Sequence, residues 1–203
     1  MQNCGNQRRR EEGNPVPQIT LCNVTSSFSL GSSLNIEEIH RIFPRSIFDR
    51  KIYGQNAVVL KREKPKMTFL IWKTGKVVCT GAKSIDDARR SVDYLHKILT
   101  RAGIAVEKRT EAKIHNLVAT TDLGRNVDIE KFLQNIDGQI SVMYEPEQFP
   151  AAILKIPVNV DTEVTILLYG TGKLVCVGSR TLEYVKDAIA ILVSKLKQTR
   201  SIP

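Results

Sequence analysis

An internal duplication is the sequence feature that most constrains how this chain can fold. Residues 67–99, MTFLIWKTGKVVCTGAKSIDDARRSVDYLHKIL, align without a gap with residues 164–196, VTILLYGTGKLVCVGSRTLEYVKDAIAILVSKL. The two copies also share upstream landmarks, namely Asn23 and Leu30-Gly31 in the first copy and Asn116 and Leu123-Gly124 in the second. Because this unit is too long for a solenoid repeat, two copies predict a pseudo-two-fold molecule rather than an extended array.

Each copy carries the hydrophobic pattern of the same run of elements. A strand near the shared asparagine precedes a short helix that begins near Leu34 or Val127. Three β-rich segments follow in each copy, at Ala57–Arg62, Met67–Trp72 and Val77–Thr80 and at Ala151–Ile156, Val164–Tyr169 and Leu174–Val177. A long helix with one apolar stripe closes each copy, with Ser84 or Thr181 as its N-cap. Because one-sided helices need a sheet to lie on, the sequence predicts an α+β fold with one sheet face free.

The free face of this sheet is the candidate binding surface. Alternation along the first strand places Asn23, Thr25 and Ser27 on the free side. The same alternation places the intervening side chains on the core side, at Cys22, Val24 and Phe28. The other strands add small apolar, hydroxyl and aromatic side chains to the free side, at Leu70, Trp72, Val78, Thr80, Asn116, Val118, Leu167, Tyr169, Val175 and Val177. A second layer of core is the alternative, but no helix remains to supply it, and an uncovered apolar face is typical of a partner site.

The excess of positive charge lies in one half of the chain. Residues 1–101 contain 18 Lys and Arg against 9 Asp and Glu, whereas residues 102–203 contain 12 of each kind. This favours an acidic polymer such as nucleic acid, although a solvated basic face explains the charge alone equally well. Lysines stand at symmetric positions beside the free face, at Lys61, Lys76, Lys155 and Lys173. This arrangement fits the minor groove of DNA. The lysines would contact phosphates, and the asparagines would face the N3 and O2 acceptors on the base edges.

Patterns typical of enzymes and metal sites are missing. The four cysteines form no CxxC pair and no Cys/His cluster, so the sequence predicts no zinc site and no other cofactor. Cys79 and Cys176 have matching apolar neighbours and are predicted to be buried thiols. The three histidines, His40, His96 and His115, have no catalytic spacing to a Cys, Ser or Asp, so the sequence predicts that the chain is not an enzyme and takes no small-molecule substrate. No apolar run approaches the ~20 residues of a membrane span.

Two longer motifs complete the pattern, KPKMTFLIWKTGKVVCTGAKS at 64–84 and YEPEQFPAAI at 144–153. With them the chain resembles the TATA-box-binding protein family over residues 18–198. The resemblance implies one repeat over 18–108 and a second over 109–200, after a flexible basic arm at 1–17. It also implies a saddle of ten antiparallel strands, with four helices on the convex face and the concave face on the minor groove of DNA.

The resemblance further implies roles for individual residues and partners. Asn23 and Asn116 would lie at the centre of the groove, and the lysines at phosphates. The full set of DNA-contacting residues that it implies is Asn23, Thr25, Gln55, Lys61, Leu70, Trp72, Lys76, Val78, Thr80, Asn116, Val118, Phe149, Lys155, Leu167, Tyr169, Lys173, Val175 and Val177. The implied partners are promoter DNA and general transcription factor IIB, which would contact Glu145 and Glu147, and the implied location is the nucleus. The equivalent loop of the first repeat, Asp49–Tyr53, is basic, which puts the family's factor IIA contact in question.

The sequence departs from the family at the side chains that wedge between base pairs. The family has a pair of phenylalanines in each repeat, of which this chain keeps only Phe149. Gln55 stands at the leading position of the first repeat, and Trp72 and Tyr169 stand at the trailing positions. Two smaller exchanges are a threonine for a valine at Thr25 and a valine for a threonine at Val177. Because an amide cannot stack into a base step as a phenyl ring does, the kink at that end is expected to be shallower.

These departures leave two questions open. They are familiar from TATA-binding-protein-like paralogues with altered specificity, but the sole family member of a divergent organism would look the same. The second alternative is an interaction module that recruits transcription factors with little DNA binding of its own.

Overall fold

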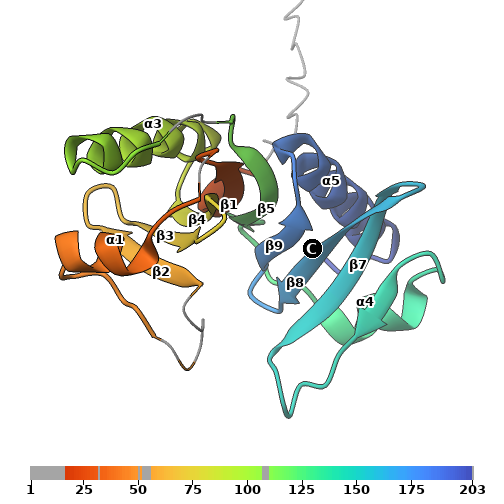
Figure 1. Ribbon diagram of the computed structural model, residues 1–203. Coiled ribbons are helices and arrows are strands. Elements are labelled where there is room, and N and C mark those ends of the chain that lie inside the picture. The colour runs from red at the N-terminus through yellow and green to blue at the C-terminus, as the bar shows by residue number, and fades with distance from the viewer. Residues whose placement is uncertain (1–16, 32, 50, 52–55, 107–109, 203) are drawn as a thin grey trace, which may run out of the picture.

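A computed structural model describes residues 17–31, 33–49, 51, 56–106 and 110–202. The described residues form one curved antiparallel sheet of nine strands together with four helices (Figure 1). The first half contains β1 (Thr20–Ser29), α1 (Ile36–Ile42), β2 (Ala57–Arg62), β3 (Met67–Trp72), β4 (Lys76–Ala82) and α3 (Ile85–Arg101). The second half contains β5 (Lys113–Asp122), α4 (Ile129–Asn135), β6 (Ser141–Met143), β7 (Ala151–Asn159), β8 (Thr162–Tyr169), β9 (Lys173–Ser179) and α5 (Leu182–Gln198).

The strand order shows the pseudo-two-fold symmetry that the duplication predicts. Across the sheet the order is β2-β3-β4-β1-β5-β9-β8-β7-β6, so the first strands of the two halves pair at the centre. The predicted α+β saddle with four helices is confirmed, but with nine strands instead of ten. In the first half, the described residues at the place equivalent to β6 form only an isolated bridge between Ile47 and Val59, whose two backbone hydrogen bonds are each 2.9 Å long.

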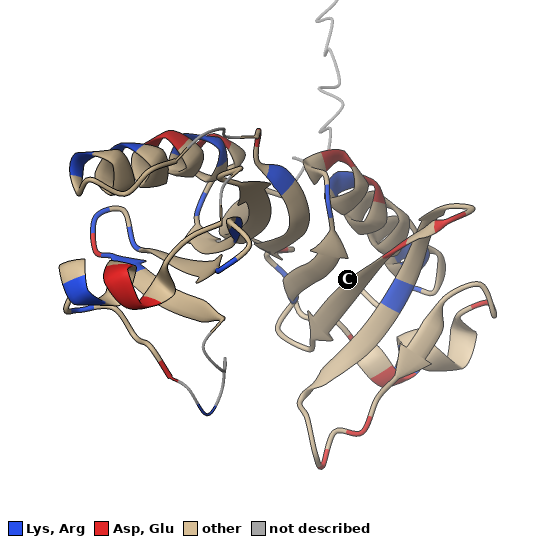
Figure 2. Ribbon diagram, in the orientation of Figure 1, with Lys and Arg blue, Asp and Glu red and all other residues tan. Residues whose placement is uncertain are grey.

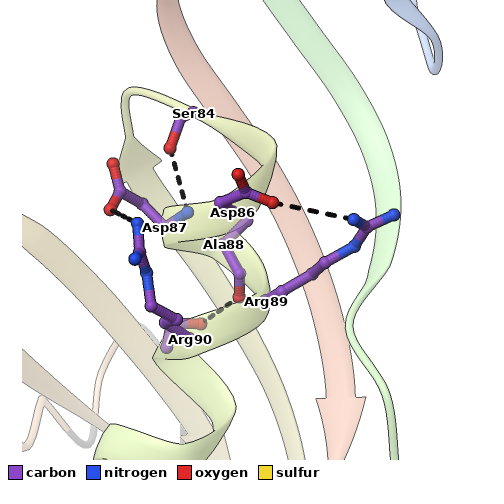
Figure 3. Close-up of polar contacts among 7 residues, drawn as sticks. Ser84, Asp86, Asp87, Ala88, Arg89 and Arg90 are labelled. Atoms are coloured by element: carbon purple, nitrogen blue, oxygen red, sulfur yellow. Dashed lines mark hydrogen bonds and ion pairs between the residues drawn. The ribbon is translucent and has the colours of Figure 1, made fainter.

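Helices α3 and α5 lie along the convex side of the sheet, and α1 and α4 lie nearer its two outer ends (Figure 1). The predicted N-caps are confirmed, because Ser84 Oγ accepts a hydrogen bond from the backbone N–H of Asp87 at 3.0 Å, and Thr181 Oγ1 accepts from Tyr184 at 3.3 Å. Figure 3 shows the first turn of α3, where exposed arginines meet Asp86 and Asp87 three residues earlier. Such exposed pairs add little stability, so the helix is held mainly by its apolar face.

Each half has its own hydrophobic core between the sheet and its long helix. In the first half Phe69 and Ile71 of β3 pack with Leu95 and Leu99 of α3, and all four are at most 1% exposed. In the second half the equivalent buried residues come from β8 and α5, at Ile166, Leu168, Leu192 and Leu196. Leu21 on the central strand β1 packs against both cores. Burial of this face explains why the alternating pattern of the strands is so regular, since a one-residue slip would expose it.

Within the described ranges, no helix has both the length and the apolar character needed to cross a membrane.

Candidate nucleic-acid interface

The concave face of the sheet carries no helix in the part of the chain that the structure describes, as Figure 1 shows below the arch of strands. Cross-strand register brings side chains of each half into rows on this face, and Thr68 and Thr165 join the predicted residues there. In the first half Leu70 lies opposite Val78, and Thr68 lies opposite Thr80. The matching rows of the second half pair Leu167 with Val175 and Thr165 with Val177. All eight side chains are half-buried and most are apolar, so the face is open to a partner.

The two symmetric asparagines are fixed by the backbone of the neighbouring strand. Asn23 Oδ1 accepts hydrogen bonds from the N–H of Gly81 at 2.7 Å and from Thr80 Oγ1 at 3.3 Å. Asn116 Oδ1 accepts from the N–H of Gly178 at 2.9 Å. A backbone N–H can only donate, so the amide oxygen must face it and the NH₂ group must face away. Each half therefore presents an oriented amide at the centre of the concave face, and the NH₂ group of Asn23 also donates a long hydrogen bond of 3.4 Å to Thr25 Oγ1.

Glycine makes this arrangement possible. Gly81 has φ +96° and Gly178 has φ +88°, a region of backbone conformation that side chains disfavour. Both lie where the sheet register shifts, between β1 and β4 and between β5 and β9. Such a bulge turns a backbone N–H out of the strand ladder and toward the asparagine.

Four exposed lysines lie around these rows, as the sequence predicts. Lys61 on β2 and Lys155 on β7 lie opposite Thr68 and Thr165 at the outer side of each half. The other two stand at the first positions of β4 and β9, at Lys76 and Lys173. Within the described residues none of the four forms an ion pair, which leaves their ammonium groups available to an anionic partner. Figure 2 shows basic positions on both halves of the molecule.

Aromatic side chains meet at one end of the sheet. The rings of Phe149 and Tyr169 lie with centroids 6.3 Å apart at an interplanar angle of 62°, an edge-to-face contact. Phe149 is 39% exposed. In the other half Trp72 is half-buried at the end of β3, beside an open hollow lined by Lys73, Lys76 and Val78. Gln55, the predicted neighbour of Trp72, lies outside the described residues, as do residues 1–16 of the predicted arm.

Two residues on the concave face were missed by the sequence analysis. The prediction that Cys22 faces the core is wrong: it is exposed, and its Sγ lies 3.3 Å from Thr120 Oγ1 on β5. His115 is likewise exposed, with Nε2 at 2.6 Å from Ser27 Oγ on β1. Register shifts around both residues explain the error, because each bulge leaves one residue without a cross-strand partner and interrupts the alternation. No local sequence signal marks these bulges.

The other cysteines and histidines that the structure describes away from the concave face include residues with structural roles. Cys79 and Cys176 are buried, as predicted, and burial raises the pKa of both thiols, that of Cys176 to about 12. His40 contacts Ser46, with Nδ1 and Oγ 2.7 Å apart in a half-buried environment. Among the described residues no three His, Cys, Asp or Glu side chains come together as metal ligands.

Comparisons with known proteins agree with this geometry. The family model described as transcription factor TFIID, or TATA-binding protein, TBP, matches residues 18–102 and 111–199. The chain belongs to the TATA-binding protein family. The TATA-box-binding protein of Archaeoglobus fulgidus is 33% identical over 89% of this chain and 95% of its own length. That of Methanocaldococcus jannaschii is 32% identical over 92% of this chain and 97% of its own length.

A solved structure of the family supports the same conclusion. The structure described as Methanococcus jannaschii TBP superposes with a TM-score of 0.78 at 33% identity, covering 90% of this chain and 99% of that one. Both the two-repeat sequence and the curved sheet are therefore features of the TATA-binding protein family.

Proposed function

We propose that this chain binds the minor groove of promoter DNA on its concave face, bends the duplex and nucleates assembly of a transcription initiation complex. The observation that carries the proposal is the fixed orientation of Asn23 and Asn116, whose amide oxygens are held by the N–H groups of Gly81 and Gly178. Their NH₂ donors face a groove in which A·T pairs offer only acceptors, N3 and O2. Membership of the TATA-binding protein family supports the same role.

The surrounding side chains suit the other surfaces of a duplex. The half-buried aliphatic and threonine rows would pack on sugars and base edges, and the four lysines would contact phosphates. The proposed contact set is that given by the sequence resemblance, and of its members Gln55 lies outside the described residues. We propose residues 18–108 and 109–200 as the two repeats that place these surfaces symmetrically.

We further propose that the kink is asymmetric and the TATA specificity altered, as in a paralogue of the standard family member. The Phe149–Tyr169 contact supplies an aromatic wedge at one end of the sheet. At the other end the sequence offers Trp72 with an amide, Gln55, at the neighbouring wedge position. Because unstacking a base step costs a few kcal/mol and an amide offsets less of it than a phenyl ring, we expect the first repeat to kink DNA less.

A protein partner is proposed at the loop between β6 and β7. Glu145 and Glu147 are exposed on this loop, and Figure 2 shows acidic positions at its tip. The backbone of Glu145 holds the loop, because its carbonyl accepts from Gln148 and Phe149 at 2.9 Å each. We propose that these carboxylates contact a basic surface of general transcription factor IIB. A factor IIA contact is not proposed, since the equivalent loop of the first repeat falls largely outside the described residues.

We propose no enzymatic role. We propose that the protein acts at chromosomal DNA, which in a eukaryotic cell lies in the nucleus. A recruitment module with little DNA binding is the second candidate function, favoured by the missing phenylalanines of the first repeat.

DNA titration at several salt concentrations tests the proposal. We expect a duplex with an A·T-rich centre to bind more tightly than a G·C-rich one, with affinity falling steeply as salt rises. Asn116→Ala and Leu167→Glu should each weaken binding about tenfold or more, because each removes or reverses a contact on the concave face. Asn135→Ala is the matched control, since that amide is exposed on α4. If neither variant changes the affinity, the recruitment function is favoured instead.

A further inference from the structure

The centre of the concave face is chemically different in the two halves at one pair of equivalent positions, Cys22 and His115. The β1–β5 register passes from Leu21 opposite Ala119 to Asn23 opposite Val118, which leaves Cys22 without a partner. It also passes from Thr25 opposite Asn116 to Ser26 opposite Ile114, which leaves His115 without one. The two bulges therefore place a thiol and an imidazole on the same face as the asparagines.

The contacts of the two side chains are related by the pseudo-symmetry. Cys22 Sγ lies 3.3 Å from Thr120 Oγ1, and His115 Nε2 lies 2.6 Å from Ser27 Oγ, so each side chain reaches across the boundary between β1 and β5. Ser27 lies opposite Val78, and Thr120 opposite Val175, which places both contacts beside the aliphatic rows of the concave face. A ligand that fills this face must touch both positions.

We propose that His115 makes DNA binding dependent on protonation, with an affinity that rises as the pH falls. This inference rests on the proposed function. Imidazole is the side chain that changes charge between pH 5 and 8. A neutral ring that hydrogen-bonds Ser27 through Nε2 has only Nδ1 left for a ligand, whereas a protonated ring donates from both nitrogens and carries a charge. The floor of the minor groove at A·T pairs offers acceptors alone, and its potential is negative, so the bound state favours the protonated ring.

Among the described residues no charged group forms an ion pair with His115, although Glu111 and Lys113 lie four and two residues before it in the chain. On β1, which packs against it, the only titratable side chain is Cys22. On β5 itself the charged residues are Lys113 and Asp122, at the two ends of the strand, and β9 contributes Lys173 and the buried Cys176. Within the described residues His115 forms no ion pair, and its hydrogen-bond partner is the uncharged Ser27. The phosphates and acceptors of DNA are therefore the principal partners for its charge.

The sign of the effect follows from linkage. If DNA favours the protonated form of His115, the complex takes up a proton, and the affinity for DNA increases as the pH falls. A single proton limits the gain to about tenfold per pH unit. We expect the wild type to bind DNA about five- to thirtyfold more tightly at pH 5.5 than at pH 8.

Binding of an A·T-rich duplex by fluorescence anisotropy at pH 5.5, 6.5 and 8 tests the inference on the full chain. His115→Gln keeps a polar side chain that does not titrate, and its affinity should change less than about twofold over the same range. Cys22→His places a second imidazole at the equivalent position and should make the pH dependence steeper than that of the wild type. Cys22→Ser is the matched control and should leave the dependence unchanged. Thermal unfolding of each variant at each pH verifies that folded protein is compared.

The outcomes separate the two proposals. If His115→Gln keeps the wild-type pH dependence, or if Cys22→His leaves it unchanged, the role of His115 is wrong although DNA binding stands. If the wild type binds no duplex at any of the three pH values, the proposed function itself fails, and the inference fails with it.

Discussion

The side-chain oxygen of Asn23 accepts a hydrogen bond from the backbone N–H of Gly81 at 2.7 Å, although 58 residues separate them in the sequence. The equivalent pair, Asn116 and Gly178, repeats this contact at 2.9 Å in the second half. In both pairs a positive φ at the glycine turns its N–H toward the asparagine. The donor groups of the concave face are thus oriented by the backbone of the sheet and need no ligand to order them.

The two glycines differ in the space around them, which predicts unequal costs of substitution. Gly81→Ala would place a Cβ 3.0 Å from the carbonyl oxygen of Lys66 and 3.3 Å from Met67 Cα, whereas Gly178→Ala would meet nothing within 4 Å. In both variants the new alanine must adopt an unfavourable left-handed backbone conformation, which costs about 1–2 kcal/mol of folding free energy. We expect Gly178→Ala to lose about that much free energy of unfolding and Gly81→Ala to lose about 1 kcal/mol more from the added contact. Urea unfolding of both variants measures the difference, and equal losses would contradict it.

The edge-to-face contact between Phe149 and Tyr169 predicts where DNA is kinked most. Phe149→Ala should reduce the bend angle, which fluorescence energy transfer between the ends of a bound duplex reports. It should also weaken binding by about 1–3 kcal/mol, a typical cost for losing a stacked aromatic ring on nucleic acid. Val160→Ala is the control, because that residue is fully exposed on the β7–β8 hairpin and away from the wedge. An unchanged bend in Phe149→Ala would exclude the ring as a wedge.

Reversing the charge of the β6–β7 loop tests the proposed partner. The double variant Glu145→Arg, Glu147→Arg should abolish binding of general transcription factor IIB to the protein–DNA complex in a gel-shift assay, because two carboxylates at the contact become like charges. DNA binding alone should change much less. The matched control is Asp161→Arg, Glu163→Arg, which reverses two exposed carboxylates on the β7–β8 hairpin. Retained factor IIB binding in the loop variant would remove this contact.

The buried thiols predict a loss of stability in alkali. Burial raises the pKa of the Cys176 thiol from 9.0 to about 12, so the folded protein keeps this proton after the unfolded chain has released it. Above pH 9 the folded state therefore holds more protons, and the free energy of unfolding falls with pH by up to about 1.4 kcal/mol per unit from this group. Urea unfolding at pH 8, 9 and 10 should show a shallower decline in Cys176→Ala than in the wild type. Cys22→Ala, which removes an exposed thiol, should decline as the wild type does.

Most of the fold could be predicted from the sequence because the hydrophobic patterns and helix caps that specify it are local and occur in both repeats. The strands Ala57–Arg62 and Met67–Trp72 match their predicted bounds, and the caps at Ser84 and Thr181 follow from side chains that accept hydrogen bonds from the next turn. The alternation of apolar residues fixed the core side of these strands, since that face must be buried as a whole.

The errors have a common cause in pairings between distant strands. Among the described residues the tenth strand is represented only by the bridge between Ile47 and Val59, a pairing across residues distant from one another that local periodicity does not report. Cys22 was placed on the wrong face because the bulge opposite β5 depends on how two strands about 90 residues apart align. His115 went unnoticed as a surface residue for the same reason.

The sequence by itself determined that this molecule is a doubled α+β unit whose sheet has one face covered by helices and one face open. It could do so because hydrophobic periodicity and helix capping depend on residues close together in the chain. Only the tertiary structure decided which atoms meet at the centre of the open face. The orientation of the two asparagine amides and the exposure of Cys22 and His115 depend on bulges between β1, β4, β5 and β9. A bulge arises from the relative register of two strands, and no single segment of the chain contains that information.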